Sequence, residues 1–541
     1  MTDTQARQST GSFEVRFSGP GARWLRLLGH RGLAPLALLL LALALYLPGL
    51  VSAPPLGIGE TQIGEPQIGE TQIVETARHM LTSGDLVDTR LRDGSERIVP
   101  PGLPLLQALS AAASGQGAEA PLWIFRLPSL AGAVLAVLLG YWCARAFVAP
   151  PPALLAGALT AAALPLGAAA RLGEPDALLL AAILAMQGAL ARIWLSRTPG
   201  ASSPGSLAAR GLAAIFWVGL GSSVLMAGLS GPVVAGLSVL ALCLAARNVR
   251  WLARLLPLPG LAILALIVLP WTLASALRGE GGILSGGSME LFAGILSGAG
   301  IGSSLGARGF GAPPLAHLLF SLVAMWPLPA FLLLGLPMLL RSTRSPQVVF
   351  FLCCLVPLWL LIELLPAKAP QQALLLVPAL AGLAALLLSR GDEGAAPHRP
   401  GRILRYAAAG LFAVPLVALV AANLVAGPLT GSWPSPPGAV IALLALVPGV
   451  SALRRLARGE AAAALMPALG AGILLAAAVW AFTLPSVAAS LAPASAPAAV
   501  AAEPVVSQPD VPETGVPETD SSETDSSETG VSEPAASGTA Q

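Results

Sequence analysis

The sequence predicts an all-α protein that crosses a membrane many times. Of its 541 residues, 55% are hydrophobic and only 11% are charged, and the mean hydropathy is +0.76. Soluble domains do not have this balance. Apolar runs of about 17 to 25 residues, each long enough to cross a hydrocarbon core of about 30 Å, recur along the chain. We expect about thirteen transmembrane helices, a large first outer loop with short interfacial helices, and a disordered C-terminal tail.

The apolar runs divide the chain into four parts. A basic cytoplasmic N-terminus covers 1–32, a transmembrane module with the outer loop 52–125 covers 33–390, further spans cover 391–486, and an acidic tail rich in Pro, Ser, Thr and Glu covers 487–541. The expected spans are centred near 33–51, 126–147, 152–168, 176–195, 208–226, 230–246, 256–276, 314–338, 348–365, 372–389, 404–426, 438–453 and 462–485.

Arginine placement predicts the orientation, because cytoplasmic loops collect positive charge. The segment before the first span carries Arg7, Arg16, Arg23, Arg26 and Arg31, so it is placed inside. Counting spans from there puts most loop arginines inside, nearly all acids outside, and the tail outside. The first span reads as a retained anchor, because no small-residue cleavage site clearly follows its long apolar core. We expect a multi-pass protein of a bacterial inner membrane.

Cysteines and histidines give no framework for a disulfide or a metal. The four cysteines, Cys143, Cys243, Cys353 and Cys354, all lie in apolar runs, and the four histidines are scattered. Outer carboxylates could hold a divalent cation, although no ligand spacing demands one. No cofactor is certain from the sequence, and no nucleic-acid partner is expected.

A pentapeptide repeat over 59–73 leads into a predicted helix. A period of five fits neither a helix nor a strand face, which favours tandem expansion over a functional array. From Glu70, apolar or small residues follow a helical spacing and predict an amphipathic interfacial helix over 70–81 that Gly84 ends. Glu70 could act as a general base toward a lipid-embedded substrate. Helix starts also favour Glu for electrostatic reasons alone.

Lys368 is the only lysine, and it lies at a break between two apolar runs. An ammonium is a compact point charge that suits phosphate oxygens, whereas a guanidinium is a planar fork. The alternative is a lysine that extends its charge to the membrane boundary.

Taken together, these segments resemble the GT-C superfamily of integral-membrane glycosyltransferases, in the branch of lipid A aminoarabinose transferase and protein O-mannosyltransferases (glycosyltransferase families 39 and 83), as a divergent member. The matching segments, in chain order, are Gly69-Glu70, Ala77-Arg78-His79-Met80-Leu81, Ser83-Gly84-Asp85-Leu86, Arg90-Leu91, Gly94, Val99-Pro100-Pro101, Arg126-Leu127-Pro128-Ser129, Arg171-Leu172-Gly173-Glu174-Pro175-Asp176 and Lys368-Ala369-Pro370-Gln371-Gln372. The resemblance covers about 30–390.

The resemblance implies transfer of a sugar from a polyprenyl-phosphate donor to a lipid, glycan or protein acceptor on the periplasmic face. Glu70 would be the base, with Asp85 and Asp176 as second choices. Residues expected to bind phosphate or substrate are Lys368, Arg78, Arg97, Arg171 and Gln372. Simpler readings are that Asp85 forms a turn, that Asp176 is a helix-start acid, and that Arg171 pairs with Glu174 in a solvated loop.

Three departures from the family pattern keep other functions open. The family's leading aspartate aligns with Gly69, its Lys-Pro-Pro lysine with Val99, and its late tyrosine with Gln372. A catalytically silent relative that binds the lipid-linked sugar or a partner is therefore an alternative. A lipid or solute transporter is a weaker one, because the spans of the two halves show no internal repeat.

Overall fold

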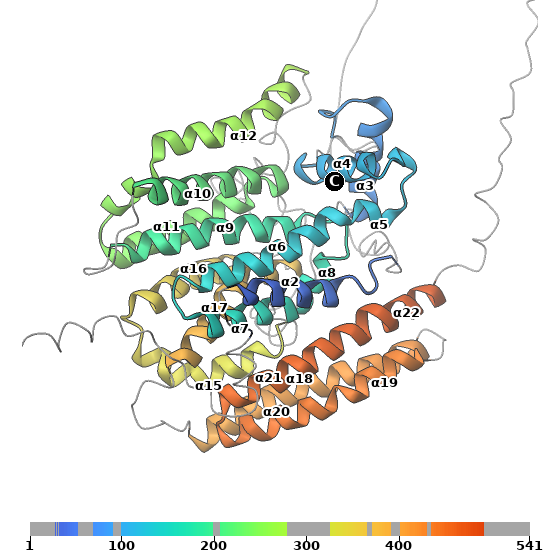
Figure 1. Cartoon of the computed structure of the whole chain (residues 1–541), viewed down its shortest axis with the longest axis vertical. Helices are drawn as coiled ribbons and strands as arrows, with labels where there is room; N and C mark the ends of the chain where they lie inside the picture. The colour runs from blue at the N-terminus through green and yellow to red at the C-terminus, as the bar shows by residue number, and fades with distance from the viewer. Residues whose placement is uncertain are drawn as a thin grey trace, which may run out of the picture. The chain divides into compact units, whose positions relative to one another are not determined.

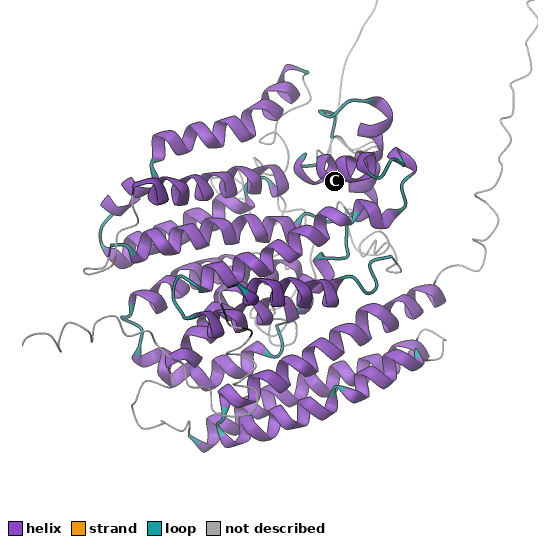
Figure 2. Cartoon of the chain, viewed as in Figure 1, coloured by secondary structure: helices purple, strands orange, loops and turns teal. Residues whose placement is uncertain are grey.

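The computed structural model describes residues 28, 30, 32–51, 69–89, 99–197, 206–278, 325–364, 370–390, 401–429 and 434–491. Every regular element within these ranges is helical (Figure 2). The predicted all-α fold class is therefore confirmed. The first residues of the predicted disordered tail, 487–491, belong to a helix, so the helical part of the chain ends later than predicted. The rest of that tail, most of the pentapeptide repeat, Arg97 and Lys368 lie outside the described residues.

The helices of the first half, up to the end of α12, include the outer-loop elements. They are α2 (Leu33–Tyr46), α3 (Glu70–Ser83), α4 (Gly102–Ala113), η1 (Gly117–Glu119), α5 (Leu122–Phe125), α6 (Leu127–Ala144), α7 (Pro150–Ala162), α8 (Leu164–Ala169), α9 (Asp176–Leu195), α10 (Ser206–Ala227), α11 (Ser230–Ala246), η2 (Arg250–Leu255) and α12 (Pro257–Leu277).

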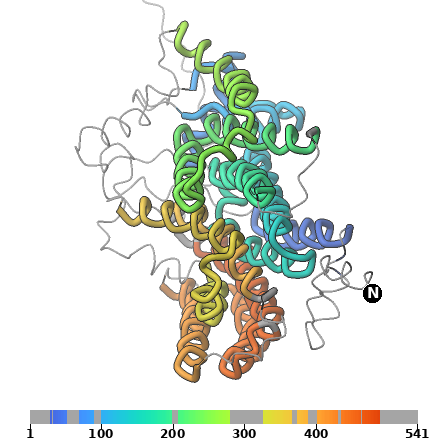
Figure 3. The backbone as a smooth tube through the Cα atoms, turned by 90° about the vertical axis from the view of Figure 1, so that its left-hand side faces the viewer, coloured from blue at the N-terminus to red at the C-terminus, as the bar shows by residue number. Residues whose placement is uncertain are grey.

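The second half contains the remaining apolar helices. They are α15 (Leu328–Arg341), α16 (Pro346–Leu364), η3 (Pro370–Leu376), α17 (Val377–Arg390), α18 (Arg402–Leu429), α19 (Pro436–Leu444), α20 (Leu446–Arg458), α21 (Ala461–Ala477), η4 (Ala478–Thr483) and α22 (Leu484–Leu491). Figure 3 shows that α18 to α22 run side by side as one group of helices.

Eight helices in the described part of the chain are long and apolar enough to cross a membrane. The chain is therefore a multi-pass membrane protein, although the count of thirteen spans is not confirmed. Two predicted spans match closely, since 176–195 is α9 and 230–246 is α11. The span predicted over 152–168 is not one helix, because the chain is extended at Ala163 between α7 and α8. Pro165 explains this break, since proline lacks the N–H that would continue the helix.

Helix α9 lies at the centre of the first half, where it packs against α6 and α10 (Figure 1). Small residues let these helices approach closely. A side chain at Gly132 of α6 would come within 2.8 Å of the backbone of Leu178, and Gly188 of α9 faces the Trp142 ring. This packing fixes the first turn of α9, and the loop that precedes it, against α6.

The outer-loop helices form their own small core. Val74, Ala77 and Met80 of α3 pack with Ala108 of α4 and Phe125 of α5. Helix α3 begins at Glu70 as predicted and ends at Gly84, whose φ of +71° is the left-handed conformation of a helix C-cap. Helix α4 was not predicted from the sequence. The loop is thus a packed layer at the end of the bundle where α9 begins.

Candidate active site at the outer loop

Glu70 and Arg126 form a buried ion pair at the base of the outer loop. Both side chains are almost completely buried, at 0% and 1% exposure. Arg126 Nε donates to Oε1 of Glu70 at 2.6 Å, and its Nη2 donates to Oε2 at 2.7 Å, which is the two-pronged geometry that guanidinium favours. Arg126 Nη1 also donates to the carbonyl of Leu50 at 3.1 Å. The pair therefore joins α3, the start of α6 and the chain that follows α2.

The same carboxylate holds the loop before α9. The backbone N–H of Gly173 donates to Glu70 Oε1 at 2.7 Å, and Gln107 Nε2 of α4 donates to the carbonyl of Gly173 at 3.3 Å. A Cβ on Gly173 would lie 3.0 Å from Gln107 Nε2 and 3.1 Å from Glu70 Oε1, closer than most side-chain contacts allow. Glycine is thus the residue that fits between these two groups.

Glu174 and Asp176 follow directly in this loop. The backbone carbonyl of Glu174 accepts a hydrogen bond from Ser129 Oγ of α6 at 2.9 Å, which fixes the residue against the bundle. Burial, together with the negative charges of Asp176 and Glu70, raises the pKa of Glu174 from 4.5 to about 8. A carboxyl group with such a pKa exchanges protons near neutral pH.

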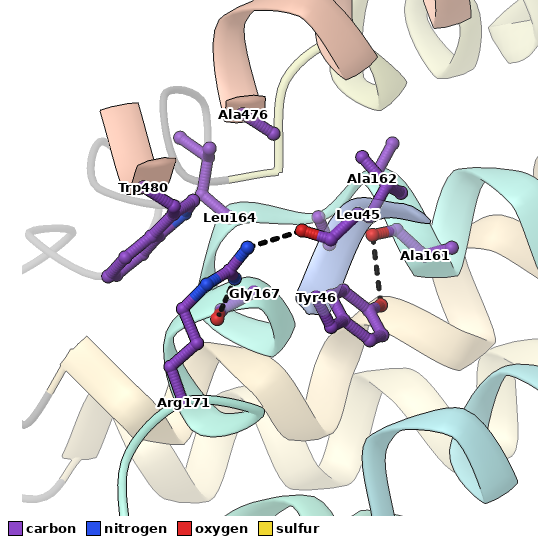
Figure 4. A pocket seen from close by; sticks show the side chains of 10 residues that line it. Leu45, Tyr46, Ala161, Ala162, Leu164, Gly167, Arg171, Ala476 and Trp480 are labelled. Carbon is purple, nitrogen blue, oxygen red and sulfur yellow. Dashed lines mark hydrogen bonds between the residues drawn. The ribbon is translucent and has the colours of Figure 1, made fainter. Parts of the chain in front are cut away.

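Arg171 has a different role from the ion pair with Glu174 that the sequence suggested. It is 1% exposed, not solvated, and its three guanidinium nitrogens donate to the backbone carbonyls of Leu45, Pro48 and Gly167. Figure 4 shows its guanidinium beside Trp480, 5.1 Å from the ring centre, at the wall of a small cavity. Burying a cation costs little free energy only where hydrogen-bond acceptors surround it, as these three carbonyl groups do. Arg171 thus joins the end of α2, α8 and the C-terminal helices.

Asp85 lies on the outer loop after α3 and away from the buried pair. Its Oδ1 accepts the backbone N–H groups of Val87 at 2.9 Å and Asp88 at 3.4 Å, the geometry of a turn-forming aspartate. Its Oδ2 pairs with Arg278 at the end of α12. The hydrogen bond from Arg278 is the main reason that the pKa of Asp85 falls to about 2. This geometry matches the simpler reading of Asp85 as a turn former.

Two further predicted residues lie in contact with protein groups. Arg78 Nη2 donates to the carbonyl of Ala120 at 3.3 Å, and its guanidinium lies 5.3 Å from the Phe125 ring centre, so it packs within the outer loop. Gln372 lies in η3, which contacts α8, α9, α16 and α17. Its Oε1 is buried without a hydrogen-bond partner. The roles of both residues in substrate binding stay predictions.

A cation site does not follow from the described residues. No group of three or more His, Cys, Asp or Glu side chains within them could hold a metal ion. None of the roles below is therefore assigned to a metal.

Sequence reasoning missed the roles of four residues of this site. Arg126 and Gly173 were quoted only as parts of motifs, and Glu174 only as a partner of Arg171. Gln107 carried no signal at all. A basic residue predicted to lie within an apolar run is the one signal that could have marked Arg126, because a buried charge needs a partner.

The described helices are similar in fold to two crystal structures of one protein, ArnT. The crystal structure of ArnT from Cupriavidus metallidurans in the apo state superposes with a TM-score of 0.57, at 17% identity over 86% of this chain and 78% of that one. The structure of the same protein bound to undecaprenyl phosphate gives 0.56 at 18% identity, over 85% and 77%. An oligosaccharyltransferase from Archaeoglobus fulgidus gives 0.44 at 14% identity, over 82% and 56%.

Comparisons of sequence found no relative of this chain. No family model matches the chain, and no curated protein is similar to it in sequence at a significant level. The resemblance is therefore one of fold, over most of the length of this chain.

Proposed function

We propose that this protein is a glycosyltransferase that moves a sugar from a polyprenyl-phosphate donor to an acceptor at the outer face of the membrane. The observation that carries the proposal is the partly buried carboxyl group of Glu174, at the outer-loop end of an ArnT-like fold. Burial raises its pKa to about 8, and Ser129 holds the backbone carbonyl of the same residue. The ArnT structure with undecaprenyl phosphate supports the class of donor, since that lipid is bound in the same fold.

The chemistry is a single displacement at the sugar. The acceptor hydroxyl attacks the anomeric carbon, a base takes the hydroxyl proton, and the bond between that carbon and the phosphate oxygen breaks, so that polyprenyl phosphate leaves. A cation stabilises the charge that develops on the phosphate. We assign to Lys368 the role of stabilising the phosphate, because a lysine ammonium suits phosphate oxygens. Lys368 also lies at the start of a predicted span, where the GT-C pattern has its phosphate-binding lysine.

The role of base is better matched by Glu174 than by Glu70. Glu70 is fully buried and accepts three hydrogen bonds, from Arg126 twice and from Gly173. Both of its carboxylate oxygens are therefore already held by protein donors. Glu174 has the pKa that general bases need near neutral pH. Asp176, two residues further on, is the second candidate, and Glu70 positions the loop that carries both.

The test is transfer of label from a radiolabelled polyprenyl-phosphate sugar pool to acceptor in membranes. Glu174→Gln and Lys368→Ala are each expected to lower transfer by about a hundredfold or more at equal expression. Glu119→Gln, which changes an exposed carboxylate of the outer loop 52–125, is the control and keeps full transfer.

Three outcomes separate the alternatives. Full activity of Glu174→Gln with loss in Asp176→Asn would move the base to Asp176. Loss in Glu70→Gln alone would return the base to Glu70. Absence of transfer by the wild type with every donor pool, while labelled donor lipid still binds, would mean a silent relative that binds the lipid-linked sugar.

A further inference from the structure

The stretch of chain from α9 to the end of α12 carries arginines without acids. Between Ala177 and Gly279 the sequence has no Asp or Glu at all. The same stretch has arginines at 192, 197, 210, 247, 250, 254 and 278. All but the last lie in or beside the loops at the end of the bundle where α9 finishes, whereas Arg278 lies at the other end, beside Asp85. This local excess of positive charge is not neutralised from within the stretch.

Arg197 and Arg254 come together at Ser196, just after the end of α9. Arg254 Nη1 donates to Ser196 Oγ at 2.7 Å, so its hydrogen bond goes to a neutral group. The Arg197 guanidinium carbon lies 3.2 Å from the centre of the Trp194 ring, and Arg197 Nε is buried without a hydrogen-bond partner. Arg254 thus reaches the residue directly before Arg197 in the chain, and its one described hydrogen bond leaves other guanidinium donors for an anion.

A rigid platform carries these two arginines. Trp194 is fully buried, donates its Nε1–H to the carbonyl of Pro346 at 3.0 Å, and meets the Trp251 ring edge-on at 5.7 Å between centroids. Trp251 belongs to η2, the short helix that bears Arg254. This edge-on contact between the two rings holds η2 against the end of α9. The backbone that carries Arg197 and Arg254 is therefore in place before any ligand binds.

The surroundings place the two arginines at the depth of lipid headgroups. Leu244 of α11 is 69% exposed, Val249 is 63% exposed, and Leu258 of α12 is 81% exposed, while Trp251 and Leu255 face the protein. Large exposed apolar side chains on a multi-pass protein face the acyl chains. Arginines immediately beyond such a belt lie where the phosphates of the same lipids lie.

We propose that Arg197 and Arg254 bind the headgroup phosphate of an anionic phospholipid. Guanidinium is the side chain best suited to a phosphate, because its planar N–H groups donate in pairs. The site is distinct from the outer loop, since the 20 residues of α9 separate them by about 30 Å (Figure 1). It does not depend on the proposed transfer of sugar.

Native mass spectrometry of the full chain in a neutral detergent tests the proposal. The protein is mixed with equal amounts of phosphatidylglycerol and phosphatidylcholine that have the same acyl chains, and retained lipid is counted. We expect the wild type to retain phosphatidylglycerol preferentially, and Arg197→Gln with Arg254→Gln to lower that retention by about tenfold or more.

Arg454→Gln with Arg458→Gln is the matched control. It removes the same charge from exposed positions of α20 at the same end of the bundle, away from the tryptophan platform, and is expected to keep the preference. Equal retention of both lipids by the wild type, or equal loss in the control pair, would overturn the proposal. So would displacement of phosphatidylglycerol by millimolar inorganic phosphate, because the site would then bind a free anion.

The single variant Arg254→Gln guards against misfolding of the double variant. Arg254 is exposed and its one described hydrogen bond goes to Ser196 Oγ, so its loss leaves the tryptophan platform intact. A several-fold loss of phosphatidylglycerol with unchanged thermal stability supports the site. Unchanged lipid retention by this variant contradicts it.

Discussion

The charged residues at the two ends of α9 differ in burial and in hydrogen bonding. At the first end, Glu70, Arg126 and the Gly173 backbone form a closed set of hydrogen bonds with no exposure to solvent. At the other end, Arg197 and Arg254 lie beside exposed apolar residues, and the stretch that carries them has no acid. Buried charges need partners in fixed geometry, whereas exposed arginines need none until a ligand arrives. We therefore expect substitutions to damage the fold at the first end and ligand binding at the second.

The largest expected effect comes from breaking the buried pair. Arg126→Met leaves the Glu70 carboxylate buried without its main partner, which costs about 3 to 5 kcal/mol. The measurement is the fraction of protein that stays folded in detergent during a temperature ramp. Arg78→Met is the control, because Arg78 is only partly buried and makes one backbone hydrogen bond. The double variant Arg126→Met with Glu70→Gln should recover part of the loss, and no recovery would argue against coupling of the two residues.

Glu174 should make thermal stability depend on pH. Its pKa is higher in the folded protein, about 8 against 4.5, so the folded state binds more protons between these values. Stability is then fully present at or below pH 4.5, falls as pH rises toward 8, and levels off above it, by a total of a few kcal/mol. Glu174→Gln should flatten this slope in melting curves taken at several pH values. Glu119→Gln should leave it unchanged, and a slope that persists in Glu174→Gln would assign it to another group.

Gly173→Ala should have an intermediate effect. Its new methyl group meets Gln107 Nε2 and Glu70 Oε1 at 3.0 and 3.1 Å, so the loop must shift, at a cost of about 1 to 3 kcal/mol. The same loop carries Glu174, so transfer activity should fall more than folding does. Gly69→Ala is the matched control, since nothing lies within 4 Å of a Cβ there and its backbone is extended. Equal behaviour of the two variants would mean that the loop is less confined than the contacts indicate.

The smallest effect is expected at the exposed pair of Asp85 and Arg278. These side chains are 32% and 44% exposed, so water screens their attraction, and Asp85→Asn should cost less than about 1 kcal/mol. Asparagine keeps the Oδ1 that accepts from Val87 and Asp88. The stability lost in Asp85→Asn should be smaller at high salt concentration than at low salt concentration, because ions screen the attraction. A loss of several kcal/mol that salt does not change would show that the contact acts as a buried one.

Much of the fold followed from local patterns. The apolar runs predicted α9 and α11 to the residue, and the spacing after Glu70 predicted α3 with its end at Gly84. Helix α4 escaped because its apolar residues follow two prolines within a loop that otherwise reads as polar. The break between α7 and α8 was not predicted, because the span was assigned from apolar composition, which does not distinguish a proline from other apolar residues.

The sequence by itself determined that this chain is a multi-pass helical membrane protein, with many of its acids in the loop 52–125 and in the C-terminal tail. Those properties depend on composition and periodicity, which any stretch of the chain carries locally. Only the tertiary structure decided that Glu70 meets Arg126, 56 residues away, and Gly173, 103 residues away. The reason is physical: a buried charge takes whichever partner the packing of α3, α6 and the loop before α9 brings within reach, and no local pattern specifies that partner.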